Sequence, residues 1–342
     1  MLSRVTLRFK LLLLTLLPFL VIVVFTYDKI SEQKVRVDYI EALDAKMNQL
    51  ENIYELTHEL QKERDLAVKF VSYPVMSVDD ALRKQLQITD SVEAYYRTFI
   101  IEHNLDTSDF YYLNTFQKVR ESLTNFSFVS GQVESDYKVL IRYYMDLVAS
   151  CASQINTVLT KEEIMAFLSL SEAKEGLGKI RYIIDKALHN GGFKRLEYGM
   201  FSGEKATFEY NLNSFIKRSP DDFRIRFQID LQDGAMMNAL DIINYCFENG
   251  TNDLVGFTSK EWWISSKGMI NHFRELELYV LKSIKGSLVI KKETIQSEKD
   301  FLYLILLTCL FGFLILVIFI TKSIILQWKK IESITNKVNL AN

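Results

Sequence analysis

The sequence has few of the residues that usually mark a catalytic or metal site. Its 342 residues include four histidines and three cysteines, and none of them stand at the close spacing of metal ligands. The sequence also lacks a glycine-rich phosphate loop, a nucleophile elbow and a kinase signature. We therefore expect a chain that is not an enzyme and that holds no metal and no cofactor.

Charge of one sign is also scarce. The formal net charge is −2 and the pI is about 6.2, so no basic face is expected for nucleic acid. Cys309 lies in an apolar run, whereas Cys151 and Cys246 are distant in sequence and fit no disulfide spacing pattern. We expect Cys151 and Cys246 to remain unbridged, because a chain of this length can bury a core without a disulfide.

Long apolar runs are present, and they stand at the two ends of the chain. Leu11 to Tyr27 and Phe301 to Ile320 carry no charged residue, and the second run reaches the roughly 20 residues that a helix needs to cross a bilayer. The first run follows Arg4, Arg8 and Lys10 but ends without a small-residue cleavage site. We interpret it as an uncleaved anchor rather than as a signal peptide.

Basic residues beside the two runs predict the topology. Lys322, Lys329 and Lys330 follow the second run, as three basic residues precede the first, and the positive-inside rule then places both ends in the cytoplasm. We predict a cytoplasmic N-terminus at 1–10, transmembrane helices at 11–27 and 301–320, an outer sensor domain at 28–300, and a cytoplasmic signalling helix at 321–342.

Between the runs, apolar residues recur at helical spacing almost throughout. Pro74, Pro220, the Gly191-Gly192 pair and several polar turns divide this region into about eight helices. We expect helices over about 28–71, 77–102, 107–125, 133–159, 160–190, 194–218, 220–248 and 259–299. Helices of this number joined by short turns favour an all-α fold made of two packed bundles.

Two of these helices share an unusual feature, an arginine within an apolar stripe. The first stripe is Leu56, Leu60, Arg64, Ala67 and Val71. The second stripe is Leu170, Ala173, Leu177, Arg181, Ile184 and Leu188. Residues at these spacings lie on one face of a helix. Since arginine does not give up its charge, a buried one needs a carboxylate or an anion beside it.

Two explanations of the arginines stay open. In the first, each arginine pairs with a carboxylate of the protein. The candidate carboxylates are Glu59 or Glu63 for Arg64, and Glu175 or Asp185 for Arg181. In the second, both guanidinium groups point into one cavity, where a small anion relieves their mutual repulsion. Trp262 and Trp263 can line such a pocket, although we expect at least one of them in the core.

Five sequence blocks, taken in order, carry a family resemblance. They are LQKERDLAVKFV at Leu60 to Val71, EGLGKIRYII at Glu175 to Ile184, HNGGF at His189 to Phe193, FSGEKATFEYNLNSF at Phe201 to Phe215, and EWWISSKGMINHFRELE at Glu261 to Glu277. Together, over about residues 50–290, they resemble the nitrate- and nitrite-sensing (NIT) domain. The resemblance implies an all-helical sensor of nitrate or nitrite in a bacterial inner-membrane receptor, with the outer domain in the periplasm.

The resemblance also implies the binding residues. The domain binds its anion through arginines on its first helix and on a middle helix, and these match Arg64 and Arg181. Secondary candidates beside them are Gln61, Lys62, Lys69 and Gly178. Two positions depart from the family pattern, because Asp65 stands where glycine is usual and Ile180 where glutamate is usual. An acid at Asp65 can neutralise Arg64 and weaken anion binding.

The end of the chain predicts the signalling partner. Residues Ile324, Trp328, Ile331, Ile334 or Thr335, and Val338 are spaced as in an amphipathic helix. This helix resembles the opening of a HAMP-type segment, which implies a homodimer that signals to a cytoplasmic output. Two rival functions share the same sequence features: a sensor of an organic acid or amine, and a structural membrane protein.

Overall fold

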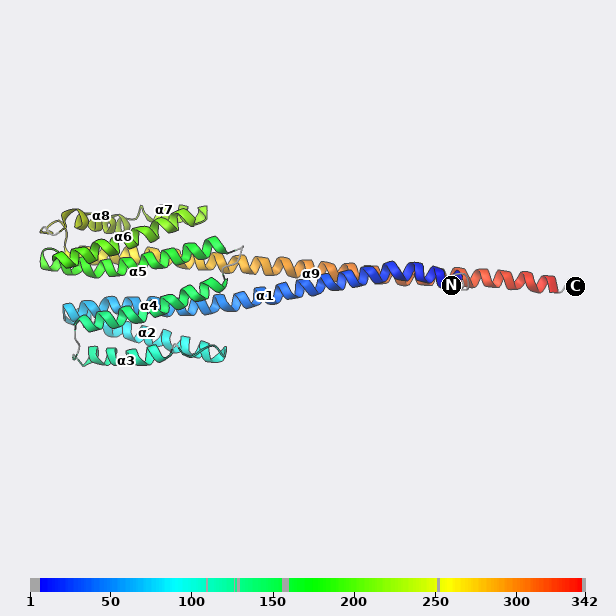
Figure 1. The fold of residues 1–342 in the computed structure, drawn as a ribbon, viewed down its shortest axis with the longest axis horizontal. Coiled ribbons are helices and arrows are strands. Elements are labelled where there is room, and N and C mark those ends of the chain that lie inside the picture. Colours follow the sequence, from blue (N-terminus) through cyan, green and yellow to red (C-terminus); the bar gives the residue numbers. More distant parts are fainter. Residues whose placement is uncertain are drawn as a thin grey trace. The chain divides into compact units, whose positions relative to one another are not determined.

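The computed structural model describes residues 7–108, 110–125, 127, 130–155, 160–250 and 253–339. Within these ranges the chain forms nine helices and no strand (Figure 1), so the predicted all-α fold is confirmed. The helices are α1 (Leu7–Ser72), α2 (Met76–Glu102), α3 (Phe110–Thr124), α4 (Ser130–Ile155), α5 (Lys161–Asn190), α6 (Arg195–Arg218), α7 (Asp221–Asp230), α8 (Gly234–Asn249) and α9 (Ser259–Asn339).

One predicted helix is in fact two. We expected a continuous helix over about 220–248, but α7 ends at Asp230 and α8 begins at Gly234. Asp233 has extended backbone angles, and its side chain accepts a hydrogen bond from the Ala235 amide at 2.8 Å. A carboxylate in this position satisfies an amide that the start of a helix leaves free, so Asp233 begins a new helix instead of continuing the old one.

Residues 43–287 form one compact unit in which the helices are arranged in two groups (Figure 1). Helices α5 to α9 make up the second group, and aromatic rings fill its core. The ring of Phe208 on α6 lies 6.1 Å from that of Phe273 on α9, and Phe215 on α6 lies 5.6 Å from Phe227 on α7. Rings at these distances bury large apolar areas and favour edge or offset contacts.

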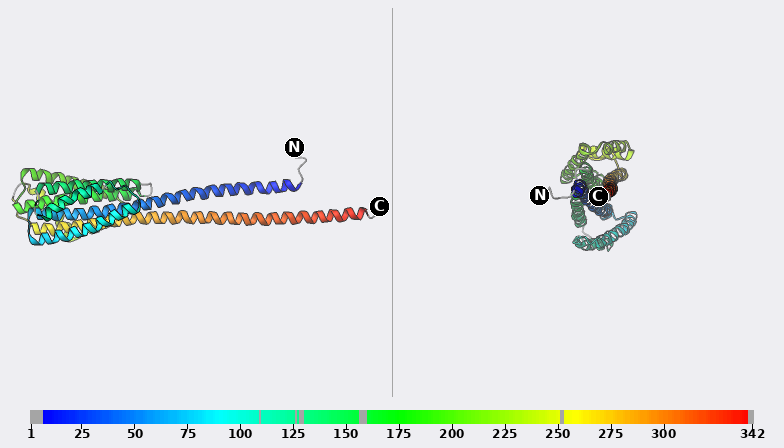
Figure 2. Two further views of the ribbon diagram at one scale, coloured as in Figure 1. Left: turned by 90° about the horizontal axis from the view of Figure 1, so that it is seen from below. Right: turned by 90° about the vertical axis from the view of Figure 1, so that its right-hand side faces the viewer.

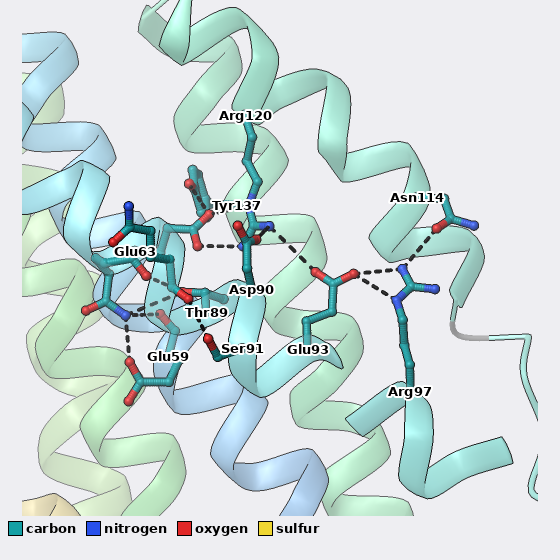
Figure 3. Close-up of polar contacts among 12 residues, drawn as sticks. Glu59, Glu63, Thr89, Asp90, Ser91, Glu93, Arg97, Asn114, Arg120 and Tyr137 are labelled. Atoms are coloured by element: carbon teal, nitrogen blue, oxygen red, sulfur yellow. Dashed lines mark hydrogen bonds and ion pairs between the residues drawn. The ribbon is translucent and has the colours of Figure 1, made fainter. Parts of the chain in front are cut away.

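In the first group, α1 to α4, the buried Arg120 connects the helices (Figure 3). Arg120 on α3 donates to both oxygens of Glu63 on α1, at 2.8 and 2.7 Å, and to Asp90 on α2 at 2.6 Å. Tyr137 on α4 donates its hydroxyl to Glu63 at 2.7 Å. Since Glu63 is fully buried, these bonds satisfy a charge that would otherwise be costly, and they fix the rotation of α1 beside Arg64.

Both predicted arginine stripes lie on buried helix faces. Arg64 and Arg181 are themselves buried, as are the leucines and alanines of each stripe, whereas the last residues, Val71 and Leu188, are half-buried. Gly191 closes α5 with φ of 81°, the left-handed conformation that the sequence predicts and that glycine adopts without strain.

The second compact unit contains residues 1–42 and 288–342, where α1 and α9 run side by side (Figure 2). Gln33 donates to Glu298 at 2.9 Å, Lys292 pairs with Glu41 at 3.0 Å, and the rings of Phe19 and Phe313 stack at 4.2 Å. Contacts recur along both helices, so they form a paired two-helix segment.

One stretch of the described chain, within Ser259–Lys330, is helical and apolar enough to cross a membrane. The side chains at 11–15, in the first apolar run, lie outside the described part of the structure. The same holds for the side chains of four residues of the predicted amphipathic helix, Ile331, Ile334, Thr335 and Val338. The backbone there is helical to Asn339. Cys151 and Cys246 are both buried and free.

Candidate functional site

Arg64 and Arg181 line one cavity of about 320 Å³ within the unit formed by residues 43–287. Its polar and aromatic lining comes from α1, α2, α5 and α9. These residues are His58, Gln61, Lys62, Arg64, Asp65, Gln85, Lys174, Arg181, Trp263, Lys267 and Asn271, and Gly178 also lines the cavity. Three secondary candidates, Gln61, Lys62 and Gly178, are therefore among the lining residues.

Arg64 has a partner on each of its three nitrogens. Its Nη1 donates to Glu175 on α5 at 2.6 Å, and its Nε and Nη2 donate to Oδ1 of Asp65 at 3.2 and 3.1 Å. Burial disfavours the charged guanidinium, but the carboxylates of Glu175 and Asp65 outweigh that effect and raise the pKa of Arg64 above its usual value. Arg64 is thus a fully compensated cation.

Arg181 is compensated less completely. Its Nη1 donates to Oδ2 of Asp65 at 3.1 Å and its Nη2 to the Trp263 carbonyl at 3.2 Å, while its buried Nε has no hydrogen-bond partner among the described residues. Burial lowers the pKa of Arg181, and the Asp65 carboxylate only partly offsets this. Since guanidinium stays protonated in proteins, Arg181 keeps a charge that an additional acceptor would stabilise.

The predicted carboxylate partners of the two arginines were wrong. Glu59 accepts from Lys62 and Gln85, Glu63 accepts from Arg120, and Asp185 accepts from Ser259. Glu175 pairs with Arg64 instead of Arg181. The expectation that an acid at Asp65 neutralises Arg64 is confirmed, and the same carboxylate also reaches Arg181.

Gly178 makes room for the Arg64 side chain. An ideal Cβ at Gly178 would lie 2.3 Å from Nη2 of Arg64, far closer than ordinary van der Waals contact. Glycine therefore allows the guanidinium to lie against α5, which is the kind of close approach that glycine permits.

The two tryptophans take different roles. Trp262 is fully buried and donates its indole N–H to the Arg181 carbonyl at 2.8 Å. Trp263 lies in the cavity wall, with the guanidinium of Arg181 and the ammonium of Lys69 each 3.6 Å from the centre of its ring system. Cations at this distance are attracted by an aromatic face. Lys69 is held there and does not line the 320 Å³ cavity.

Sequence reasoning missed Lys174 and His58. Lys174 lies seven residues before Arg181, on the same helix face, and that spacing was the available signal. It is buried and donates to Glu277 at 2.6 Å and to Tyr54 at 3.2 Å.

Nδ1 of His58 is buried and has no partner within the described chain. Burial, with the charges of Lys174 and other nearby cations, lowers the pKa of His58 well below its usual value and so favours the neutral ring.

Comparisons with known proteins agree with this fold. The sequence model of one protein family, described as "Nitrate and nitrite sensing", matches residues 55–285. A solved structure described as "Structure of the NasR transcription antiterminator" superposes with a TM-score of 0.67 at 14% identity, covering 81% of this chain and 79% of that one. At this identity the likeness concerns the fold alone. No curated protein matches the sequence.

Proposed function

Since the chain belongs to the nitrate- and nitrite-sensing family, we propose that its helical domain binds nitrate or nitrite between Arg64 and Arg181. The observation that carries this proposal is that both guanidinium groups line one cavity and face a single carboxylate. A place where two arginines share one carboxylate suits a small oxyanion, because its oxygens surround the central atom as the oxygens of a carboxylate surround its carbon.

The surroundings of the arginines support a small planar anion. Guanidinium is planar and presents its donors as a fork, so two such groups can meet the oxygens of nitrate from two sides. Nε of Arg181 has no hydrogen-bond partner in the described part of the chain, and this guanidinium lies 3.6 Å from the centre of the Trp263 ring system, whose face attracts it.

We further propose that the anion signal crosses a bacterial inner membrane. In this proposal Leu11 to Tyr27 and Phe301 to Ile320 are two membrane spans, residues 28–300 lie in the periplasm, and residues 321–342 pass the signal, as a homodimer, to a cytoplasmic output. Support comes from the apolar helix within Ser259–Lys330 and from the contacts between α1 and α9, such as that of Gln33 with Glu298. Both helices continue without a break from the sensor unit.

Calorimetry on the full chain in lipid nanodiscs tests the binding proposal. We expect heat with nitrate and nitrite in the wild-type chain and its loss in Arg181→Ala. Arg181→Lys should bind at least about tenfold more weakly, because lysine keeps the charge but loses the fork. Arg142→Ala is the matched control, since Arg142 is an exposed arginine on α4.

Two results would turn the proposal toward its rivals. Heat from a carboxylate or amine, with none from either nitrogen oxyanion at millimolar concentration, would favour a sensor of an organic ligand. Unchanged signalling in both Arg64→Ala and Arg181→Ala would favour a structural membrane protein.

Cysteine labelling in intact spheroplasts tests the topology. Ser297 and Ser333 are exposed and stand on either side of the second apolar run. A membrane-impermeant maleimide should label Ser297→Cys and should leave Ser333→Cys unlabelled until the membrane is opened. Labelling of both variants in intact spheroplasts would contradict a crossing between them.

A further inference from the structure

We propose that Asp65 is an internal ligand of the anion site, whose carboxylate holds the place of the incoming anion and must leave when the anion binds. Asp65 would thereby set both the affinity and the selectivity of the site. The inference rests on the proposed function, because it concerns the anion that Arg64 and Arg181 bind.

The geometry of Asp65 is that of a bound oxyanion. Its Oδ1 accepts from Nε and Nη2 of Arg64 at 3.2 and 3.1 Å, and its Oδ2 accepts from Nη1 of Arg181 at 3.1 Å. One planar O–C–O group therefore joins the two guanidinium groups. The planar O–N–O group of nitrate or nitrite has the same pattern of acceptors.

The charges of the two guanidinium groups are already balanced before an anion enters. Arg64 and Arg181 carry two positive charges, and Asp65 and Glu175 carry two negative ones. Two further cations of the lining are paired as well, Lys174 with Glu277 and Lys62 with Glu59, whereas Lys267 is exposed to solvent. An added anion would leave excess negative charge in a largely buried place, which is costly unless a carboxylate moves out.

Asp65 is the carboxylate that can move. Its side chain retains 11% of its accessible surface against 6% for Glu175, and its hydrogen bonds in the described chain come from the two arginines alone. Glu175 is held by shorter bonds, because it accepts from Arg64 at 2.6 Å and from Gln61 at 2.9 Å, whereas the bonds to Asp65 are 3.1 to 3.2 Å long. Outward rotation of one short side chain would free donors on both guanidinium groups at once.

Exchange of Asp65 for a ligand would also change how α1 meets α5. The described ion pairs between these helices are Arg64 with Glu175 and Asp65 with Arg181. Binding would keep the first pair and replace the second with a bridge through a free anion. The ligand would thus act at one of two electrostatic links between the helices. Nitrate or nitrite, a planar monoanion, would fit in the place of the carboxylate, whereas a tetrahedral dianion such as sulfate would not.

Calorimetry with nitrate, nitrite, formate and sulfate on the full chain in nanodiscs tests this assignment. Asp65→Asn removes the charge but keeps the shape, so nitrate should bind at least about tenfold more tightly, about 1.4 kcal/mol. Asp65→Ala leaves the space empty, so formate should bind there as a replacement for the missing carboxylate. Asp241→Asn should match the wild type, because Asp241 is exposed on α8.

The outcomes separate the inference from the proposed function. If the wild type binds nitrate and Asp65→Asn binds it with equal or lower affinity, Asp65 is not an internal ligand. That result would leave the binding proposal standing. Binding of nitrate or nitrite by none of the variants would overturn the binding proposal itself. As a check on folding, nitrate should raise the melting temperature of Asp65→Asn more than that of the wild type, because a tighter ligand stabilises the folded state more. An equal or smaller rise would also count against the internal ligand.

Discussion

Gly178→Ala is the most direct test of how Arg64 lies in the site. The added methyl group would be 2.3 Å from Nη2 of Arg64, whereas ordinary contact begins at about 3.4 Å, so the guanidinium must shift by about 1.1 Å. Arg64 is tied at all three nitrogens, with bonds of 2.6, 3.1 and 3.2 Å. A shift of that size lengthens such bonds past the range of normal hydrogen bonds.

The magnitude follows from two opposed effects. Overpacking costs about 1–3 kcal/mol, whereas alanine in place of glycine inside a helix gains about 1 kcal/mol. Gly203→Ala on α6 is the matched control, because no atom lies within 4 Å of its added Cβ. The gain in helix propensity is common to both variants, so Gly178→Ala should be less stable than Gly203→Ala by about 1–3 kcal/mol.

Thermal unfolding of the full chain in nanodiscs, followed by circular dichroism, measures this difference. For a domain of this size, 1 kcal/mol shifts the melting temperature by about 2–4 °C, so the two variants should differ by roughly 2–12 °C. Nitrate should also bind Gly178→Ala more weakly than Gly203→Ala. Equal melting temperatures and equal affinities would refute the close approach of Arg64 to α5.

Two further predictions concern the buried charges around the site. Arg120→Met should lower the free energy of unfolding by about 3–5 kcal/mol, because the fully buried carboxylate of Glu63 loses its bidentate partner. The double variant Arg120→Met/Glu63→Leu should recover most of that loss. Urea unfolding at pH 7 measures both, and a loss below about 1 kcal/mol in the single variant would contradict a buried pair. His58 has a pKa that burial and neighbouring cations lower in the folded chain, so the unfolded chain binds this proton more readily. Its contribution to stability is then complete above the unfolded pKa of about 6.5 and falls by up to about 1.4 kcal/mol per pH unit below it. The melting temperature should therefore drop more between pH 7.5 and 5.5 in the wild type than in His58→Gln, and equal drops would show that His58 is not shielded from protonation.

Helical spacing, prolines and glycines predicted most of the fold. The ends of α1 near Pro74 and of α5 at Gly191 follow from backbone chemistry that any surroundings would respect. The break between α7 and α8 was missed because apolar residues keep their helical spacing across it. Asp233 and Gly234 are a capping residue and a poor helix former in succession, and this local signal was outweighed by the longer pattern.

The arginine positions were predictable, but most of their partners were not. Glu59 lies five residues before Arg64, a spacing at which side chains do not face each other on a helix. Glu63 is adjacent to Arg64 in sequence, as Asp65 is, but its carboxylate is taken up by Arg120 on α3. Asp185 does stand at the favourable spacing of four from Arg181, yet it accepts from Ser259 at 2.5 Å on a different helix. Partner choice thus depends on how α5 is rotated against α1 and α9, and no pattern within one helix fixes that rotation.

The two explanations that the sequence left open, an internal carboxylate or an external anion, describe one geometry. A carboxylate fixed on α1 competes with any free anion at an effective concentration of millimolar or higher, as for a group on a short tether. A free oxyanion that binds the guanidinium groups no better than a carboxylate must then reach a comparable concentration before it occupies the site. In this proposal Asp65 would tune the domain toward abundant ligand, whereas a glycine at position 65 would leave the same two arginines open to a scarce one.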